Sequence, residues 1–264
     1  METPCGCSIL KGLAINADSS NQKAANGSGS QRAFATTSWS LVLEATQASS
    51  PEAVAALSQL CQVYWFPLYT FLRRKGVARV EAEDLTQAFF AELLEKDRLQ
   101  QADPERGRFR SFLLTSMSNF FSNHRRDQSR LKRGGGQSPI RLDFENADNR
   151  FNELASDEMT PERSFQRQWA LSVLTQTLEA VSVQYQESGK AELFEQLQPF
   201  LTGDDQVPYR ELANSTGMKE GAIKVAVHRL RQRYGQQLRL QISKTVADPN
   251  EVEQELRDLF EALG

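Results

Sequence analysis

Apolar side chains recur at steps of three and four residues through most of the chain beyond residue 50. The first such stripe follows Ser50 and Pro51, an N-cap residue and a proline suited to the first helical position. Its members are Val54, Leu57, Cys61, Tyr64, Leu68 and Phe71. This period is typical of a helix with one buried face, and the alternation that marks half-buried strands is nearly absent. The sequence therefore predicts an all-α protein.

Prolines and glycines divide the pattern into successive helices. Pro67 lies inside the first stripe and predicts a kink or a break into two helices, because proline lacks the amide hydrogen that a helix needs. Thr160-Pro161 repeats the cap-and-proline start, and Asp248-Pro249 opens a last amphipathic helix. The further predicted helices run over about 81–99, 109–132, 161–181, 193–200, 208–215, 219–240 and from 248 to the end.

Composition shifts along the chain predict two small helical domains joined by a flexible linker. Residues 1–37 are rich in Ser, Asn and Gly and are expected to be a disordered tail. A helical block at 38–133 ends at Gly134–Gly136, and the polar, aperiodic stretch 134–159 is expected to be the linker. A second block covers 160–241. An acidic amphipathic helix is expected at 242–264.

The sequence offers little for catalysis. His124 and His228 are the two histidines, too few for a metal cluster or a histidine-based triad, and no G-x-S-x-G, P-loop or H-E-x-x-H motif occurs. Cys5-x-Cys7 begins a metal site or, by the plainer interpretation, consists of two cysteines in a loose tail. The sequence thus predicts neither an enzyme nor a cofactor or metal.

No apolar run approaches the roughly 18–20 residues that span a membrane. Met1–Ala17 lacks a basic segment followed by a long apolar one, so no signal peptide is expected. The three cysteines form no disulfide framework. The expected location is a reducing cytoplasm, with no membrane partner.

Charge is distributed unevenly along the chain. The 31 basic and 34 acidic residues give a net charge of -3, which by itself argues against binding a polyanion. However, Glu105–Arg133 carries +6 and Met218–Gln241 carries +5, which leaves -14 for the rest. Two basic islands of this kind are able to hold DNA even in an acidic protein. The alternative is that they are two ordinary solvated helix faces.

The second basic island has the pattern of a helix-turn-helix. The helix at Tyr209–Ala213 is followed by a turn at Thr216-Gly217, where glycine allows the positive φ of a tight turn. The next helix has Ile223, Val227, Leu230 and Tyr234 on its predicted inner face. On the opposite face lie Glu220, Lys224, His228 and Arg231. That outer row is suited to the major groove of DNA.

Aromatic residues are interleaved with the first basic island. Phe109, Phe112, Phe120 and Phe121 precede His124-Arg125-Arg126. Aromatic side chains beside arginines suit a surface that stacks on unpaired bases and holds their phosphates. The loop at about 97–108 is a candidate for catching an extruded base. The alternative for each phenylalanine is plain core packing.

The two islands together resemble one family. Tyr64–Tyr69, Glu83–Phe90 and Asp103–Leu113 resemble domain 2 of a bacterial extracytoplasmic-function (ECF) sigma factor of the sigma-70 family. Tyr209–Arg233 resembles domain 4 of the same family. The resemblance covers about 39–240. The sequence departs from the family pattern at Lys219, where a Ser or Thr helix cap is more usual, and in its two terminal extensions.

The resemblance implies a subunit that binds core RNA polymerase, through its β′ coiled coil and β flap, and promoter DNA. An anti-sigma factor or another regulator is left open as a further partner. The expected polymerase-binding residues are Asp84, Leu85, Gln87 and Phe90. The expected contacts to the -10 element are Arg106, Arg108, Arg110, Asn119, Asn123, His124, Arg125 and Arg126. The expected contacts to the -35 element are Arg210, Lys219, Lys224, His228 and Arg231.

Two other functions remain as alternatives at this point. One is a helix-turn-helix regulator that binds duplex DNA and never contacts polymerase. The other is an interaction protein whose basic islands bind an acidic partner. The extension at 242–264 carries six acids against two bases, and we expect it to pack on domain 4; shielding a basic helix and docking another protein are the alternatives.

Overall fold

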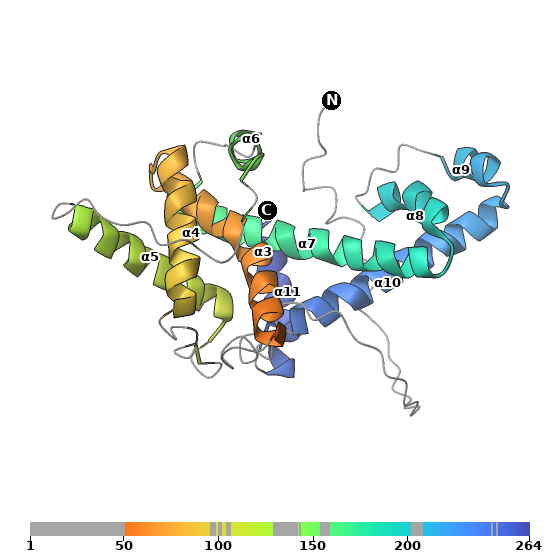
Figure 1. The fold of residues 1–264 in the computed structure, drawn as a ribbon. Helices are drawn as coiled ribbons and strands as arrows, with labels where there is room; N and C mark the ends of the chain where they lie inside the picture. The colour runs from red at the N-terminus through yellow and green to blue at the C-terminus, as the bar shows by residue number, and fades with distance from the viewer. Residues whose placement is uncertain are drawn as a thin grey trace. The chain divides into compact units, whose positions relative to one another are not determined.

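The computed structural model describes residues 51–95, 99, 102–103, 107–128, 142, 144–153, 159–201, 208–243, 245–246 and 248–264. The predicted tail at 1–37 and the start of the predicted linker lie outside these residues. In the described part every regular element is a helix and no strand occurs, which confirms the all-α prediction (Figure 1).

The chain divides into two compact units. Among the described residues, unit 2 comprises those up to Val173 together with Gln241–Ala262. Unit 1 comprises Leu174–Leu240 and the last two residues. The divisions fall within helices α7 (Pro161–Glu187) and α10 (Glu220–Ser243), whereas the sequence suggested a boundary at 134–159.

Unit 2 is built on helices α3 (Pro51–Arg74), α4 (Arg79–Glu95) and α5 (Phe109–Gln128). Helix α3 packs on α4, and α4 contacts α5 (Figure 1). The predicted stripe on α3 is buried from Cys61 onward, and burial raises the pKa of the Cys61 thiol to about 12. The predicted break at Pro67 is wrong. Helix α3 runs through it as one element.

A segment of the predicted linker folds onto α3 instead of remaining extended. Helix α6 (Ala147–Glu153) begins with a fully buried alanine, and just before it the ring of Phe144 packs edge-on against Trp65, with centroids 5.1 Å apart. Asp148 accepts a hydrogen bond from the Tyr69 hydroxyl and pairs with Arg73 at 3.0 Å. Arg150 adds a contact over the Phe66 ring at 3.9 Å, so several side chains of this otherwise polar stretch hold the segment on α3.

The first part of α7 and the C-terminal helix complete unit 2. The Thr160 hydroxyl accepts a hydrogen bond from the Arg163 amide at 3.2 Å, as the predicted cap requires. Helix α11 (Val252–Glu261) follows a short 3₁₀ turn, η5 (Pro249–Glu251), capped by Asp248. The buried side chains Leu256 and Leu259 lie on its inner face. The extension shares unit 2 with residues 161–173, the start of the predicted second block, whereas the helix-turn-helix belongs to unit 1; its expected packing on domain 4 stays a prediction.

Unit 1 contains the rest of α7 with α8 (Ala191–Leu197), the 3₁₀ turn η4 (Gln198–Leu201), α9 (Tyr209–Thr216) and most of α10. The predicted inner face of α10 is buried from Ile223 to Tyr234. The Tyr234 hydroxyl donates to the Leu174 carbonyl at 3.1 Å, and burial raises the pKa of this phenol.

Helices α9 and α10 are joined by a three-residue turn. Gly217 ends α9 with a φ of 67°, in the left-handed region where a side chain is unfavourable, as the sequence predicted. The Thr216 hydroxyl accepts a hydrogen bond from the amide of Met218 and so fixes the turn.

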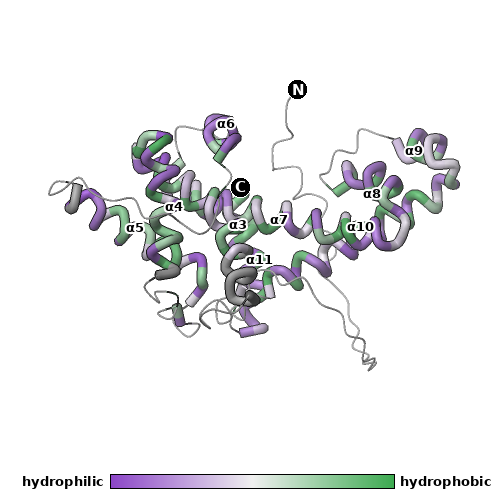
Figure 2. Tube along the Cα trace, viewed as in Figure 1, coloured by the Kyte–Doolittle hydropathy of each residue, from purple (hydrophilic) through white to green (hydrophobic). Residues whose placement is uncertain are grey.

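Figure 2 shows hydrophilic residues interspersed with hydrophobic ones along the helices of both units. Within the described part of the chain, no helix is long and apolar enough to cross a membrane.

Candidate functional site

Helix α4 presents a narrow exposed face on the side away from its packed residues. Successive residues of a helix are rotated by about 100° around its axis, so an exposed residue can directly follow or precede a buried one in sequence. Asp84 is exposed and Gln87 is half-exposed, as their predicted role in binding requires. Val80, 67% exposed, and Ala88 lie on the same face. We call the four residues Val80, Asp84, Gln87 and Ala88 the α4 outer face.

Two further residues predicted to bind polymerase, Leu85 and Phe90, do not lie on the α4 outer face. Leu85 and Phe90 are only 3% and 1% exposed, and the Phe90 ring packs edge-on against Phe89 at 5.6 Å. They belong to the core of unit 2, where they hold α4 in place. Beside the outer face, Glu83 is engaged by Arg79 at 2.9 Å, and this hydrogen bond raises the pKa of Arg79.

The second half of α5 carries a polar surface built on half-buried aromatic rings. Phe120 packs edge-on against Phe89 on one side and stacks on the His124 ring on the other, at a centroid distance of 6.4 Å. The Arg125 guanidinium lies 5.9 Å from the centre of the Phe121 ring. The predicted residues that gather here are Asn119, Asn123, His124, Arg125 and Arg126, and we call them the α5 distal surface.

Hydrogen bonds along α5 order this surface. The guanidinium of Arg126 donates to the Asn123 side-chain carbonyl at 2.9 Å. Asn119, Arg125 and Arg126 are exposed, while His124 is half-buried against its neighbouring ring. The arrangement combines exposed cations, amides and ring edges, which is what contacts to both phosphates and bases require.

Two other arginines predicted to contact the same partner are already engaged within unit 2. The Arg110 Nε and Nη2 atoms donate to the two Glu255 carboxylate oxygens at 2.9 and 2.8 Å. Arg108 Nε lies 2.8 Å from Glu255 Oε2, and Arg108 also pairs with Asp258. Arg110 is buried. Arg110 and Arg108 are thus engaged by carboxylates in the structure, their contact with DNA stays a prediction, and Arg106 lies outside the described residues.

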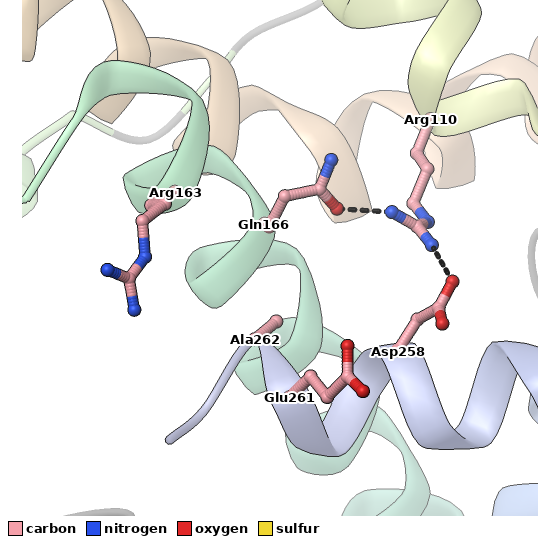
Figure 3. A pocket seen from close by; sticks show the side chains of 6 residues that line it. All are labelled: Arg110, Arg163, Gln166, Asp258, Glu261 and Ala262. Carbon is pink, nitrogen blue, oxygen red and sulfur yellow. Dashed lines mark hydrogen bonds and ion pairs between the residues drawn. The ribbon is translucent and has the colours of Figure 1, made fainter.

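Helix α7 supplies the remaining walls of this cluster. Arg110 donates to the Gln166 side chain, and its guanidinium lies 4.4 Å from the centre of the Trp169 ring, within range of a cation–π interaction. Figure 3 shows Arg110 reaching from α5 between Gln166 of α7 and Asp258 of α11, with Arg163 pointing away from it. We call Arg108, Arg110, Gln166, Trp169, Glu255 and Asp258 the arginine–carboxylate cluster.

The exposure of the side chains increases from the buried interior of the cluster to its rim, which is open to solvent. Glu255 is 1% exposed, whereas the side chains of Arg108 and Asp258 are about a quarter exposed. A pocket of about 250 Å³ adjoins the rim and is lined by Arg110, Arg163, Gln166, Asp258, Glu261 and Ala262 (Figure 3). Burial opposes the charge on Asp258, but hydrogen bonds from Gln254 and Arg108 outweigh it, so the pKa of this carboxyl lies below its ordinary value.

In unit 1 the residues predicted to contact the -35 element, which include part of the outer row of α10, are only partly available. Arg210, Lys219, Lys224 and His228 are exposed. Lys224 pairs with Glu220 at 2.7 Å, which lowers the pKa of the carboxyl and raises that of the amine. An exposed pair of this kind exchanges readily for other partners, since it contributes little to stability.

Arg231 differs from the rest of that row. Its Nε and Nη2 atoms donate to the Phe200 carbonyl at 3.2 and 2.9 Å. The Phe200 ring in turn stacks on Tyr209, 5.2 Å away, so Arg231 helps to hold η4 beside the start of α9. This residue supports the fold of unit 1 rather than standing free on its surface.

Sequence reasoning missed the arginine–carboxylate cluster. Its carboxylates lie 145 to 150 residues from its arginines, and the signal available was the spacing of Glu255 and Asp258 on the polar side of an amphipathic helix. Among the described residues no group of His, Cys, Asp and Glu is arranged to hold a metal ion.

Comparison with known proteins gives one match. Residues 67–131 match the family described as Sigma-70 region 2. The matched segment includes the end of α3, all of α4 and α5, and hence both the α4 outer face and the α5 distal surface. No curated protein and no solved structure matches the chain. The match supports membership of the sigma-70 family, with a role in polymerase binding and promoter recognition.

Proposed function

We propose that the protein is an ECF-type sigma factor, a subunit that binds core RNA polymerase and directs it to promoters. The match of residues 67–131 to sigma-70 region 2 carries this proposal. The α4 outer face lies within the matched segment and combines a carboxylate, an amide and exposed apolar atoms. Such a face suits a helical protein partner, and we assign it to the coiled coil of the polymerase β′ subunit.

The α5 distal surface is assigned to the -10 element. Opening a duplex exposes bases, which stack on rings and on guanidinium planes, and leaves phosphates that cations neutralise. His124 stacked on Phe120 and Arg125 over Phe121 supply both kinds of contact on one helix. Asn119 and Asn123 add amides able to hydrogen-bond to base edges.

Unit 1 is assigned to the -35 element through the helix-turn-helix formed by α9 and α10. The exposed candidates for contact with this DNA are Arg210, Lys219, Lys224 and His228. Arg231 is left out, because its guanidinium is bound to the Phe200 carbonyl. Lys224 exchanges Glu220 for a phosphate or base when DNA is bound. The same unit is the candidate for the contact with the polymerase β flap. In this account the protein carries out no chemical reaction, and it works in the cytoplasm with the polymerase.

The decisive test removes the two polar groups of the α4 outer face. Asp84→Ala with Gln87→Ala should abolish capture of cognate core polymerase by the immobilised protein, while the helix content stays unchanged because both side chains point outward. The matched control is Gln186→Ala with Glu187→Ala, an exposed amide and carboxylate on α7 of unit 1, which should leave capture intact.

The rival function predicts another outcome. A helix-turn-helix regulator that never contacts polymerase should not capture core polymerase in any form, wild-type included. Equal capture by the Asp84/Gln87 variant and the control would also overturn the assigned role of the α4 outer face.

A further inference from the structure

The C-terminal helix α11 brings negative charge to two arginines at the start of α5. Residues 242–264 carry six acids and two bases. Glu255 and Asp258 lie on successive turns of α11 and face Arg108 and Arg110 within unit 2. The acidic extension is therefore fixed at a definite place on the unit that contains the sigma-70 region 2 segment.

The contacts resemble those that an arginine makes with nucleic-acid phosphate. A guanidinium binds a carboxylate and a phosphate with the same forked geometry. Glu255 accepts from Arg110 through both of its oxygens, and one of these oxygens also lies 2.8 Å from Arg108 Nε. With α11 in place, both arginines direct their donors toward carboxylates.

We infer that α11 is a built-in competitor of nucleic acid, which occupies Arg108 and Arg110 through Glu255 and Asp258 until DNA phosphate replaces them. The inference rests on the proposed function, since it gives these arginines a role in DNA binding only after α11 has moved. It reconciles the position of the two arginines in a promoter-binding segment with their engagement in the structure.

The rim of the cluster provides a route for exchange. Arg108 and Asp258 are the partly exposed members, and the 250 Å³ pocket opens beside Asp258. Phosphate first meets Arg108 at this rim, and the interior pair of Arg110 with Glu255 exchanges afterwards. Gln166 and Trp169 stay in contact with Arg110 during the exchange, because both belong to α7 and not to α11.

The test measures binding of the full-length protein to a fluorescently labelled DNA fork, with duplex and single-stranded arms, over a range of salt concentrations. The variant Glu255→Gln with Asp258→Asn keeps acceptor oxygens but removes both charges. In the wild type each of the two phosphate contacts forms by breaking an internal ion pair, which salt itself weakens, so the exchange adds little to the salt dependence of binding. Without the two carboxylate charges the phosphate contacts count in full, and the slope of log affinity against log salt should steepen by about 1.4 to 1.8. The affinity ratio of variant to wild type should accordingly rise about tenfold from 200 to 50 mM salt.

A matched control separates competition from a general change in charge. Glu251→Gln with Glu253→Gln removes the same number of charges from exposed positions at the start of the helix, outside the pocket. This control should keep the wild-type slope. Amide hydrogen exchange should also show faster exchange over Val252–Glu261 in the Glu255/Asp258 variant than in the control.

A milder variant keeps the test valid if the double variant folds poorly. Asp258→Asn alone changes the exposed rim and should give about half of the slope change. Wild-type slopes in both cluster variants, or the same steepening in the control, would overturn the inference while leaving the proposed function intact. Absence of binding by every form, wild-type included, would also overturn the inference, whereas the proposed function is refuted separately, by a wild-type protein that does not capture core polymerase.

Discussion

Removing the Glu255 side chain tests whether the arginine–carboxylate cluster supports unit 2. In Glu255→Ala, the buried Arg110 loses both of its hydrogen bonds to this carboxylate, and Arg108 loses one partner. Breaking a buried ion pair from one side costs ~3–5 kcal/mol, because a charge is left in the interior without its partner. Arg110 retains Gln166, Trp169 and a 3.5 Å contact with Asp258, so we expect a loss of about 3 kcal/mol.

The assay is urea unfolding followed by tryptophan fluorescence. Trp65 and Trp169 both belong to unit 2, so their signal reports on this unit. The control Glu261→Ala alters an exposed carboxylate on the same helix and should change the free energy of unfolding by less than about 0.5 kcal/mol. A loss below about 1 kcal/mol in Glu255→Ala, or equal losses in the two variants, would refute the reasoning.

Three further predictions follow from single contacts. Folding lowers the pKa of Asp258, which faces Arg108 and Arg110, from its ordinary 3.8, so the ionised carboxylate stabilises the folded protein above that value and this contribution disappears as the pH falls below it. Between pH 5 and pH 3, urea unfolding should therefore show a smaller loss of stability in Asp258→Asn than in the wild type. Equal losses would contradict this. Gly217→Ala should destabilise unit 1 by ~1–2 kcal/mol, because a side chain is strained at the positive φ of this residue. Thermal unfolding measures the loss, with Gly221→Ala, at an open position on α10, as the control. Equal melting temperatures of the two variants would exclude backbone strain at Gly217. Arg231→Gln should also lower the melting temperature of unit 1, since it removes two charge-assisted hydrogen bonds to the Phe200 carbonyl, each worth ~1.5–3 kcal/mol. If the melting temperature falls no further than in Arg229→Gln, a change at an exposed position, the role of Arg231 in the fold is contradicted.

The sequence predicted the helices well because local rules decide them. The starts at Pro161 and Pro249, the left-handed Gly217 and the buried face of α10 all depend on neighbours within a few residues. At Pro67 the prediction was a kink or a break; the break is wrong, because α3 continues with buried side chains on both sides of the proline, and the kink stays a prediction.

Assigning exposed residues from a motif was less successful. Asp84 and Leu85 are neighbours in the same motif, but Asp84 is exposed and Leu85 is buried, and the motif alone does not say which of them faces a partner. The helical period would have separated them, since Leu85 and Phe89 share one buried face.

The engagement of Arg108 and Arg110 was beyond local reasoning. Charge counting correctly located a basic island, but it treated every arginine in it as available. The carboxylates that occupy two of them come from the far end of the chain, and only the folded structure brings the segments together. Helix α6 illustrates the same limit, because Asp148 is anchored by Tyr69 and Arg73, 79 and 75 residues away in sequence.

The central claim is that this protein gives core RNA polymerase its promoter specificity. Its most direct test is sequencing of the RNA made in vitro from fragmented genomic DNA by cognate core polymerase, with and without the protein. The account predicts transcripts with defined 5′ ends that appear only when the protein is present and share two sequence elements upstream. Identical transcripts in both reactions would contradict it.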